Sequence, residues 1–529
     1  MLDLTGLRDA VGYEGRVSRR LFLAYGAALS SLPFLPRTSW ANSAPTFSSD
    51  PFTLGVASGD PDDHSVVLWT RLAPSPLQPD GGMGFDDVEV QWEVAEDEGM
   101  KSIVCSGKTI APQRLAHSVH VEPTGLKPDH WYYYRFQAGD AVSPVGKTRT
   151  MPSIDVMPEK LRFAFASCQN WEAGLFTPYQ QMAQDNLDLV FHLGDYIYEY
   201  AAGRNGKVRT HHGDEINSLS DYRIRHAQYK TDPDLQEMHR QCPWMVTWDD
   251  HEFDNNCAAE ISEQKDVVAA DFLVRRANAY QAYYEAMPLR ASCLPKGPDM
   301  QLYRKASFGR LAELLVLDTR QYRSNQPNND KRSPLNDEAL NPQASMLGVE
   351  QKKWLYNNLE ESKGTWNVLA QQVMMGMVGH RMKDEEHGYS MDQWPGYAAE
   401  RMELMKFMEM RHISNPIVLT GDIHSNWANE LRVDDRKTDT KLVATEFVVT
   451  SISSGGNGVD KPKTHDMIVA DNACVKFHNA QRGYVRCEVT PENWKTDYVV
   501  VDKVIEPGGV CSVRSSFVVE SNDPSLKTA

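Results

Sequence analysis

The chain has 529 residues, more than one hydrophobic core usually holds, so we expect a large domain and at least one smaller module. Hydrophobic residues make up 41% of it and charged residues 24%, without a low-complexity tract or a short repeat, which argues against a disordered or solenoid protein. The formal net charge of −17 argues against a nucleic-acid-binding module, and it implies that bound cations attract any anionic substrate.

The first 44 residues are typical of an export signal. Arginines at 16–20 precede a moderately apolar run at 21–35, and small residues at 41–44 follow, as at a signal-peptidase site. Residues 18–23 resemble the twin-arginine signal, although Ala24 stands where a lysine is often found. We therefore expect export through the twin-arginine (Tat) machinery to the periplasm or beyond. An amphipathic first helix or a retained anchor is the alternative. Elsewhere no stretch reaches the ~18 apolar residues that span a bilayer.

Residues 46–152 are predicted to form a small all-β domain. Short apolar or alternating runs such as 65–69 and 88–94 are separated by turn-rich pieces such as 79–82, which is typical of an antiparallel β-sandwich of the fibronectin or immunoglobulin type. Aromatic residues alternate along one later strand, and we interpret them as core: Tyr132, Tyr134 and Phe136.

From about residue 160 to 520 the pattern changes to buried strands that end in polar residues. Strands are predicted over 161–166, 187–193, 244–248, 366–370 and 416–420. In open α/β sheets ligands bind outside the carboxyl ends of strands, so we expect these five ends to converge on one site. A helix is predicted over 269–287, and the expected fold is an α/β sandwich of two sheets flanked by helices.

Side chains at these strand ends are suited to metal ions. Asp195 can bridge two cations, and the phenolate of Tyr198 can reach one of them from the same side. Asp250 offers a second carboxylate, and Asp422 and His424 lie on one face of an extended segment. The structural alternatives are a Gly-Asp turn, a helix cap and a satisfied core histidine.

Three further residues join this set. Cys168 is a plausible thiolate ligand for trivalent iron, with simple packing as the alternative. Gln371 has an amide oxygen suited to a hard cation, although plain hydrogen bonding fits almost as well. His251 follows Asp250 and can donate a proton to a phosphoryl oxygen or a leaving group. A helical zincin site is excluded here because Asn255 stands where the second histidine is required.

Seven ordered motifs together resemble the PhoD alkaline phosphatase and phosphodiesterase family of calcineurin-like metallophosphoesterases. They are FASCQ at 165–169, HLGDYIYE at 192–199, WDDHE at 248–252, LDTRQYR at 317–323, NVLAQQ at 367–372, DQWPGY at 392–397 and GDIHS at 421–425. The resemblance covers nearly the whole mature chain, including the N-terminal sandwich and the export signal.

The resemblance implies a cluster of iron(III) and calcium(II), similar in plan to that of purple acid phosphatases. When the family's ligands are transferred to the matching motifs, the implied iron ligands are Cys168, Asp195, Tyr198 and His424, with Asp195 bridging the two ions. The implied calcium ligands are Asp250, Asp422 and Gln371. Oxygen ligands are what a hard cation prefers, in agreement with this assignment.

The implied activity is hydrolysis of phosphate monoesters and diesters by a metal-activated hydroxide. His251 and Asp195 are the catalytic candidates, and His251 and Arg320 are candidates for binding the phosphate, with a buried ion pair as the alternative for Arg320. We expect a monomer. Two rival functions remain: a phospholipase D-like or teichoic-acid phosphodiesterase, and a ligand-capture protein that uses the same fold without catalysis.

Overall fold

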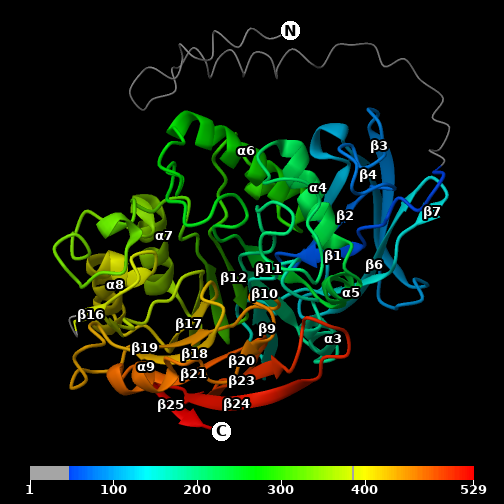
Figure 1. Cartoon of the computed structure of the whole chain (residues 1–529). Coiled ribbons are helices and arrows are strands. Elements are labelled where there is room, and N and C mark those ends of the chain that lie inside the picture. Colours follow the sequence, from blue (N-terminus) through cyan, green and yellow to red (C-terminus); the bar gives the residue numbers. More distant parts are fainter. Residues whose placement is uncertain (1–46, 384–385) are drawn as a thin grey trace, which may run out of the picture. The chain divides into compact units, whose positions relative to one another are not determined.

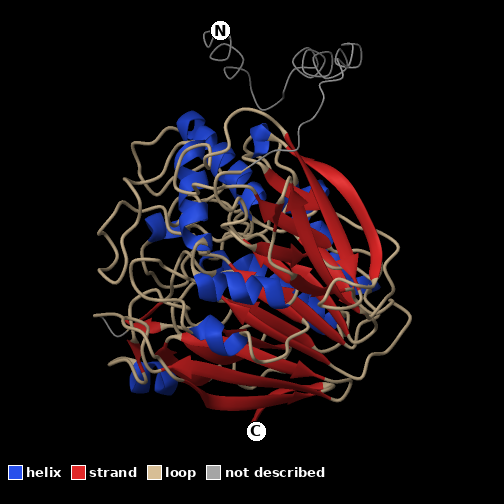
Figure 2. Ribbon diagram, turned by 90° about the vertical axis from the view of Figure 1, so that its right-hand side faces the viewer, coloured by secondary structure: helices blue, strands red, loops and turns tan. Residues whose placement is uncertain are grey.

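The computed structural model describes residues 47–383 and 386–529, so the predicted signal at 1–44 lies outside the described residues. Two large sheets dominate the fold, and their stacked strands are red in Figure 2. None of the described helices is long and apolar enough to cross a bilayer. All eight cysteines are free thiols.

The larger sheet has ten strands. Most of them carry labels in Figure 1. Their order is β25 (Asp523–Thr528), β24 (Cys511–Glu520), β23 (Asn493–Val501), β22 (Gly483–Val489), β9 (Leu161–Ala166), β10 (Leu189–Leu193), β11 (Trp244–Thr247), β1 (Val56–Gly59), β2 (Val67–Arg71) and β5 (Ser118–Val121). Strands β9, β10 and β11 are parallel neighbours, so their carboxyl ends lie at the same edge of the sheet.

The second sheet has eight strands. Their order is β12 (Arg304–Phe308), β13 (Ala312–Val316), β14 (Trp366–Ala370), β17 (Pro416–Thr420), β19 (Ala444–Val448), β18 (Asn426–Leu431), β21 (Val475–Gln481) and β20 (Gly458–Val459). Strands β13, β14, β17 and β19 are parallel, which again gathers their carboxyl ends at one edge. A short hairpin pairs β15 (His380–Arg381) with β16 (His387–Gly388).

The two large sheets enclose an apolar core between them. Along β9, Phe163 and Phe165 point into this core, whereas Ala164 and Ala166 belong to the cluster on the opposite face of the sheet. That face is covered by α3 (Pro178–Met182), α4 (Leu219–Lys230), α5 (Pro233–Gln241) and α6 (Ala269–Ala286). The outer face of the eight-stranded sheet packs against α7 (Gly348–Glu361) and α8 (Ala398–Met410), and α9 (His465–Asp471) packs beside β21. The predicted two-sheet α/β fold is therefore confirmed.

Local signals in the sequence account for the helices near the candidate site. A capping box starts α4, in which the Ser218 side chain accepts from the backbone N–H of Asp221 and the Asp221 side chain accepts from that of Ser218. Asp232 caps α5, and Pro233 occupies its first turn, where the missing N–H costs nothing.

The N-terminal strands divide between two sheets. One is a five-stranded sheet of β4 (Ile103–Ala111), β3 (Val88–Ala95), β6 (Trp131–Ala138) and β7 (Ala141–Val142), with β8 (Gly146–Arg149) paired to β6. The other layer is β1, β2 and β5, and the two layers share an apolar core that includes Tyr132, Tyr134 and Phe136, as predicted. Strand β1 also pairs with β11, so this layer continues the ten-stranded sheet. No pattern in the sequence indicates that junction.

The C-terminus is more ordered than the sequence indicates. A polar stretch from Asn522 suggests fraying, yet β25 pairs with β24 as the last strand of the large sheet. The backbone N–H of Ala529 also donates to the carbonyl of Ser516. The expectation of a frayed end was wrong because pairing with β24, a contact between separate segments, decides the conformation.

Helix α4 ends at a buried lysine, Lys230, and we expect this residue to make the free energy of unfolding depend on pH. The ammonium of Lys230 lies 4.3 Å from the centroid of the Trp69 ring, and among the described residues it has no carboxylate within salt-bridge distance. Burial lowers the pKa of Lys230 from 10.5 to about 7. Between these values the unfolded chain binds more protons than the folded one, so stability rises with pH, by about 1.4 kcal/mol per unit. Urea unfolding from pH 7 to 10 should show this slope in the wild type and its loss in Lys230→Met.

Candidate metal centre

Four candidate ligands share an unusual backbone conformation. Cys168, Asp195, Asp422 and His424 have φ angles of 59°, 56°, 66° and 54°, the left-handed region that side chains other than glycine rarely adopt. Each of them follows the carboxyl end of a strand from one of the two large sheets. Such strain persists where surrounding structure enforces it, and it concentrates at functional sites.

Hydrogen bonds and two glycines hold these turns against one another. The backbone N–H of Cys168 donates to the carbonyl of Gly194 at 3.1 Å, and that of Gln169 donates to the carbonyl of Asp195 at 3.0 Å. A Cβ atom on Gly194 would lie 2.4 Å from the Cβ of Asp249, and one on Gly421 would lie 2.9 Å from that of Ser167. Only glycine allows these segments to approach so closely.

The first group of metal-competent atoms comes from both sheets. One ligand atom each from Cys168, Asp195 and His424 lie within 4.8 Å of one another. The hydroxyl of Tyr198 donates to Asp195 Oδ2 at 2.9 Å and lies 3.1 Å from His424 Nε2. The structure thus brings together all four residues expected to hold iron. The hydroxyl of Ser454 lies 2.8 Å from the Tyr198 oxygen.

The second group shares Asp195 with the first. Ligand atoms of Asp195, Asp250 and His251 also lie within 4.8 Å of one another. His251 Nδ1 lies 2.8 Å from the buried carboxylate of Glu199, and its ring stacks on Tyr198 with centroids 4.2 Å apart. Burial alone would lower the pKa of His251, but the charges of Glu199, Asp250 and Asp195 outweigh burial and raise this pKa well above its usual value. A charged imidazole beside the shared carboxylate can donate a proton or bind an anion.

Arg320 lies beneath the carboxylates and is fully buried. Its guanidinium binds Asp249, contacts both oxygens of Asp392 at 3.0 Å, and lies 3.4 Å from Asp422 Oδ1 and 3.6 Å from Asp250 Oδ2. Because carboxylates engage its donors, this geometry favours the ion-pair alternative over phosphate binding by Arg320.

The polar atoms of the Gln371 amide are occupied by hydrogen bonds within the protein. Its amide nitrogen donates to the carbonyl of Val373 and the hydroxyl of Thr420, both at 2.6 Å. Its oxygen accepts from the indole of Trp394 at 3.1 Å. All of these contacts are internal, which favours the hydrogen-bonding alternative that the sequence left open.

The site holds more negative charge than its own cations neutralise. Asp195 Oδ1 and Asp249 Oδ2 are buried oxygens without a hydrogen-bond partner. Burial, reinforced by the charge of Asp250, raises the pKa of both carboxyls well above the usual value, although His251 and Arg320 oppose this. Burial likewise raises the pKa of Asp422 to about 7. In their charged form these buried carboxylates need a counter-charge, so the thiol, phenol, imidazole and carboxylate donors fit bound cations.

Glu252 is a buried residue of the site whose contacts were not predicted from the sequence. Its buried carboxylate accepts from the backbone N–H of Asp195 at 3.0 Å, of Asp249 at 2.8 Å, and of Tyr196. It therefore ties the turn after β10 to the turn after β11. In the sequence, only its position directly after His251 connects Glu252 with the site. That position does not reveal that its carboxylate contacts the segment after β10.

Glu252→Gln should destabilise the protein and lower its activity together. Glutamine keeps the shape but has one acceptor oxygen, so at least one buried N–H loses its partner, at a cost of about 1–3 kcal/mol. The turn that carries Asp195 would also loosen. Urea unfolding and turnover of nitrophenyl phosphate measure the two effects. Glu313→Gln is the matched control, because Glu313 is also buried but, within residues 47–383 and 386–529, accepts only from the Ser307 hydroxyl. Wild-type values for Glu252→Gln would contradict this role.

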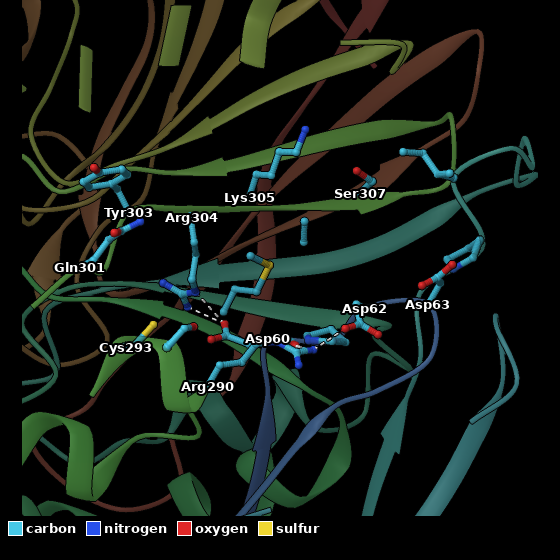
Figure 3. A pocket seen from close by; sticks show the side chains of 16 residues that line it. Asp60, Asp62, Asp63, Arg290, Cys293, Gln301, Tyr303, Arg304, Lys305 and Ser307 are labelled. Atoms are coloured by element: carbon cyan, nitrogen blue, oxygen red, sulfur yellow. Dashed lines mark hydrogen bonds and ion pairs between the residues drawn. The ribbon is translucent and has the colours of Figure 1, made fainter. Parts of the chain in front are cut away.

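A cavity of about 550 Å³ lies apart from these side chains. Figure 3 shows Asp60 beside Arg304 and Asp62 beside Arg290, whereas Lys305 points away from these pairs. Arg304 binds Asp60 and Arg290 binds Asp62. None of the candidate metal ligands lines this cavity, and its arginines are already paired, so we do not assign the reaction to it.

Comparisons with known proteins agree with this arrangement. Residues 163–498 match the model of the PhoD-like phosphatase family, and residues 38–152 match that of the PhoD-like phosphatase N-terminal domain. Alkaline phosphatase D of Bacillus subtilis (strain 168) is 53% identical over 490 residues, which cover 92% of this chain and 84% of that protein. A solved structure of PhoD superposes with a TM-score of 0.90 at 53% identity, covering 92% of this chain and 93% of the other. The chain therefore belongs to the PhoD-like phosphatase family and is a hydrolase that acts on phosphoric esters.

Proposed function

We propose that this protein is an exported alkaline phosphatase with phosphodiesterase capability, whose activity depends on iron(III) and calcium(II). The observation that carries the proposal is the pair of metal-competent groups that share Asp195 at the rim of the two sheets. The 53% identity to a protein named alkaline phosphatase D supports the choice of reaction and favours an enzyme over a ligand-capture protein.

Iron(III) would be held by Cys168, Asp195, Tyr198 and His424, whose thiol, carboxylate, phenol and imidazole converge. Calcium would be held on the side of Asp250 and Asp422, with Asp195 between the two ions. Arg320 Nη2 contacts both of those carboxylates, so calcium would share them with a guanidinium. Gln371 would have to exchange its present hydrogen bonds to become a ligand.

When bound, the metal pair supplies a Lewis acid that activates water and neutralises charge on the phosphoryl group. His251 is the candidate proton donor. Glu199 accepts from Nδ1, which leaves Nε2 available for a substrate oxygen. Stacking on Tyr198 fixes the plane of the ring, so the donor is oriented before substrate arrives.

Export, location and assembly belong to the same proposal. The arginine-rich start of the chain supports passage through the twin-arginine machinery, which carries folded proteins already loaded with metal. The mature enzyme would then act in the periplasm or outside the cell, as a monomer.

Removal of calcium tests the proposal. Dialysis of the purified mature enzyme against a calcium chelator should lower turnover of nitrophenyl phosphate and bis(nitrophenyl) phosphate at least about 100-fold, because charge stabilisation worth several kcal/mol is lost. Added calcium should restore both activities. The ratio of the two activities before chelation separates a monoesterase from a phospholipase- or teichoic-acid-type diesterase. Full turnover by metal-free protein would contradict the mechanism.

A further inference from the structure

Arg482 is a buried cation that the proposed reaction does not use. Only 6% of it is exposed. It is the single residue between β21 of the eight-stranded sheet and β22 of the ten-stranded sheet, so the chain crosses from one large sheet to the other at this position. Its carbonyl accepts from the backbone N–H of Val501 at 2.9 Å, which fixes the point from which the side chain starts.

The guanidinium of Arg482 holds the turn that carries His424. Its Nη1 donates to the backbone carbonyl of His424 at 2.7 Å and to the hydroxyl of Ser451, also at 2.7 Å. The hydroxyl of Thr450 donates to the same carbonyl at 3.1 Å. Because His424 has a left-handed backbone, donors on its carbonyl help to enforce a conformation that is otherwise unfavourable.

Two buried serines extend these contacts to other candidate iron ligands. The hydroxyl of Ser451 donates to the carbonyl of Ser454 at 2.7 Å, and the hydroxyl of Ser454 donates to the carbonyl of Cys168 at 2.7 Å. The Ser454 hydroxyl is also the group that lies 2.8 Å from the Tyr198 oxygen. A chain of hydrogen bonds therefore joins Arg482 to the turn of Cys168 and to the phenol of Tyr198.

A glycine loop is shaped around the guanidinium. A Cβ atom on Gly458 would lie 2.8 Å from Nη2 and 2.9 Å from Nε of Arg482, and Gly458 has a φ angle of 68°. A Cβ atom on Gly455 would lie 3.5 Å from Nη2. Nε is covered and has no hydrogen-bond partner within the described ranges. The loop thus covers the cation without neutralising it.

The charge of Arg482 lacks a carboxylate partner in residues 47–383 and 386–529. An arginine keeps its proton in proteins, and a buried charge is costly unless an opposite charge lies nearby. The ionisable groups close enough to supply one are Cys168 and Tyr198. Both side chains become anions when they hold a metal ion.

We propose that Arg482 is a positioning residue of the iron side of the metal centre, which holds the turn of His424 and offsets the negative charge of the Cys168 and Tyr198 ligands. This inference rests on the proposed iron site. A positive charge beside two anionic donors lowers the electron density that they give to iron(III), which keeps it a stronger Lewis acid. Loss of that charge should make iron(III) harder to reduce.

Reduction of the purified mature enzyme at a controlled potential tests this proposal, with the visible absorption of the iron centre as the signal. At the potential that reduces half of the wild-type iron, Arg482→Gln should be only about 10% reduced, a roughly tenfold lower ratio of reduced to oxidised iron. Arg482→Met, a second neutral variant, should show the same shift. Arg482→Lys keeps the charge and should stay within about threefold of the wild-type ratio.

Arg71→Gln is the matched control. Arg71 is also buried, and its hydrogen bonds within the described part of the chain go to the carbonyls of Ala116 and Arg223, away from the candidate ligands. Its substitution removes a buried positive charge of the same kind, so it should leave the ratio of reduced to oxidised iron unchanged.

Two results would overturn the proposal. One is a wild-type ratio of reduced to oxidised iron in both neutral variants, which would show that the charge of Arg482 does not act on the iron. The other is loss of iron from all three Arg482 variants but not from Arg71→Gln, which would make Arg482 only a structural tie. Elemental analysis of the same samples separates these failures from that of the proposed function, because a wild-type enzyme that is active without iron would contradict the iron site itself.

Discussion

Asp195→Asn is expected to lower kcat/KM for nitrophenyl phosphate by about 10³-fold or more. Asp195 belongs to both metal-competent groups, and an amide offers one neutral oxygen where two charged oxygens are needed to bridge cations. The loss corresponds to several kcal/mol of transition-state stabilisation.

The same substitution should not unfold the protein. Burial raises the pKa of Asp195 well above normal, so in the metal-free chain the neutral side chain is favoured, and asparagine imitates it. Thermal unfolding without metal should be unchanged or slightly improved, whereas the rise in Tm on adding metal should vanish. Asp185→Asn is the control, since Asp185 binds Arg486 and Tyr484 elsewhere. Near-normal turnover of Asp195→Asn would contradict the bridging role.

His251→Asn should lower kcat about 10²- to 10⁴-fold, the usual range for loss of a positioned proton donor. The effect should depend on the leaving group. Nitrophenolate leaves without a proton, whereas an alkyl alcohol needs one, so the loss should be larger for an alkyl phosphate if His251 is the acid. An equal loss for both substrates would show instead that His251 binds the phosphate.

Substitution of a second histidine serves as a control that distinguishes a role of His251 in the reaction from a purely structural one. His120→Asn removes a half-buried ring that hydrogen-bonds the carbonyls of Tyr284 and Met287, remote from the metal centre. It should leave kcat within about twofold of the wild type. Equal losses in His251→Asn and His120→Asn would exclude a catalytic role for His251.

Much of the fold and of the site could be predicted from the sequence because the candidate ligands follow directly after the strands that position them. The apolar strands β10 and β17 are followed at once by Gly194-Asp195 and Gly421-Asp422. Because parallel strands place their carboxyl ends at one edge of a sheet, the strand pattern alone predicts that such residues gather there. Tyr198 and His424 lie three and two residues beyond those carboxylates, so their convergence with Asp195 follows from the same turns.

What the sequence could not show depends on contacts between distant segments. The junction of β1 with β11 rests on one paired position, Gly59 opposite Trp244, which leaves no periodic pattern. Arg320 and Gln371 belong to two of the seven motifs, but their hydrogen-bond partners, Asp392 and Trp394, lie in a third motif. Residue type alone does not tell whether such a side chain faces the substrate or another side chain.

We infer that side chains that follow separate strands surround two adjacent cations. The most direct measurement is an anomalous difference map from crystals of the mature enzyme, collected on both sides of the iron absorption edge. We expect an iron peak within bonding distance of Cys168 Sγ, Asp195, Tyr198 and His424, and a lighter ion beside Asp250 and Asp422. Fully active crystals with no metal peak at these residues would contradict the account.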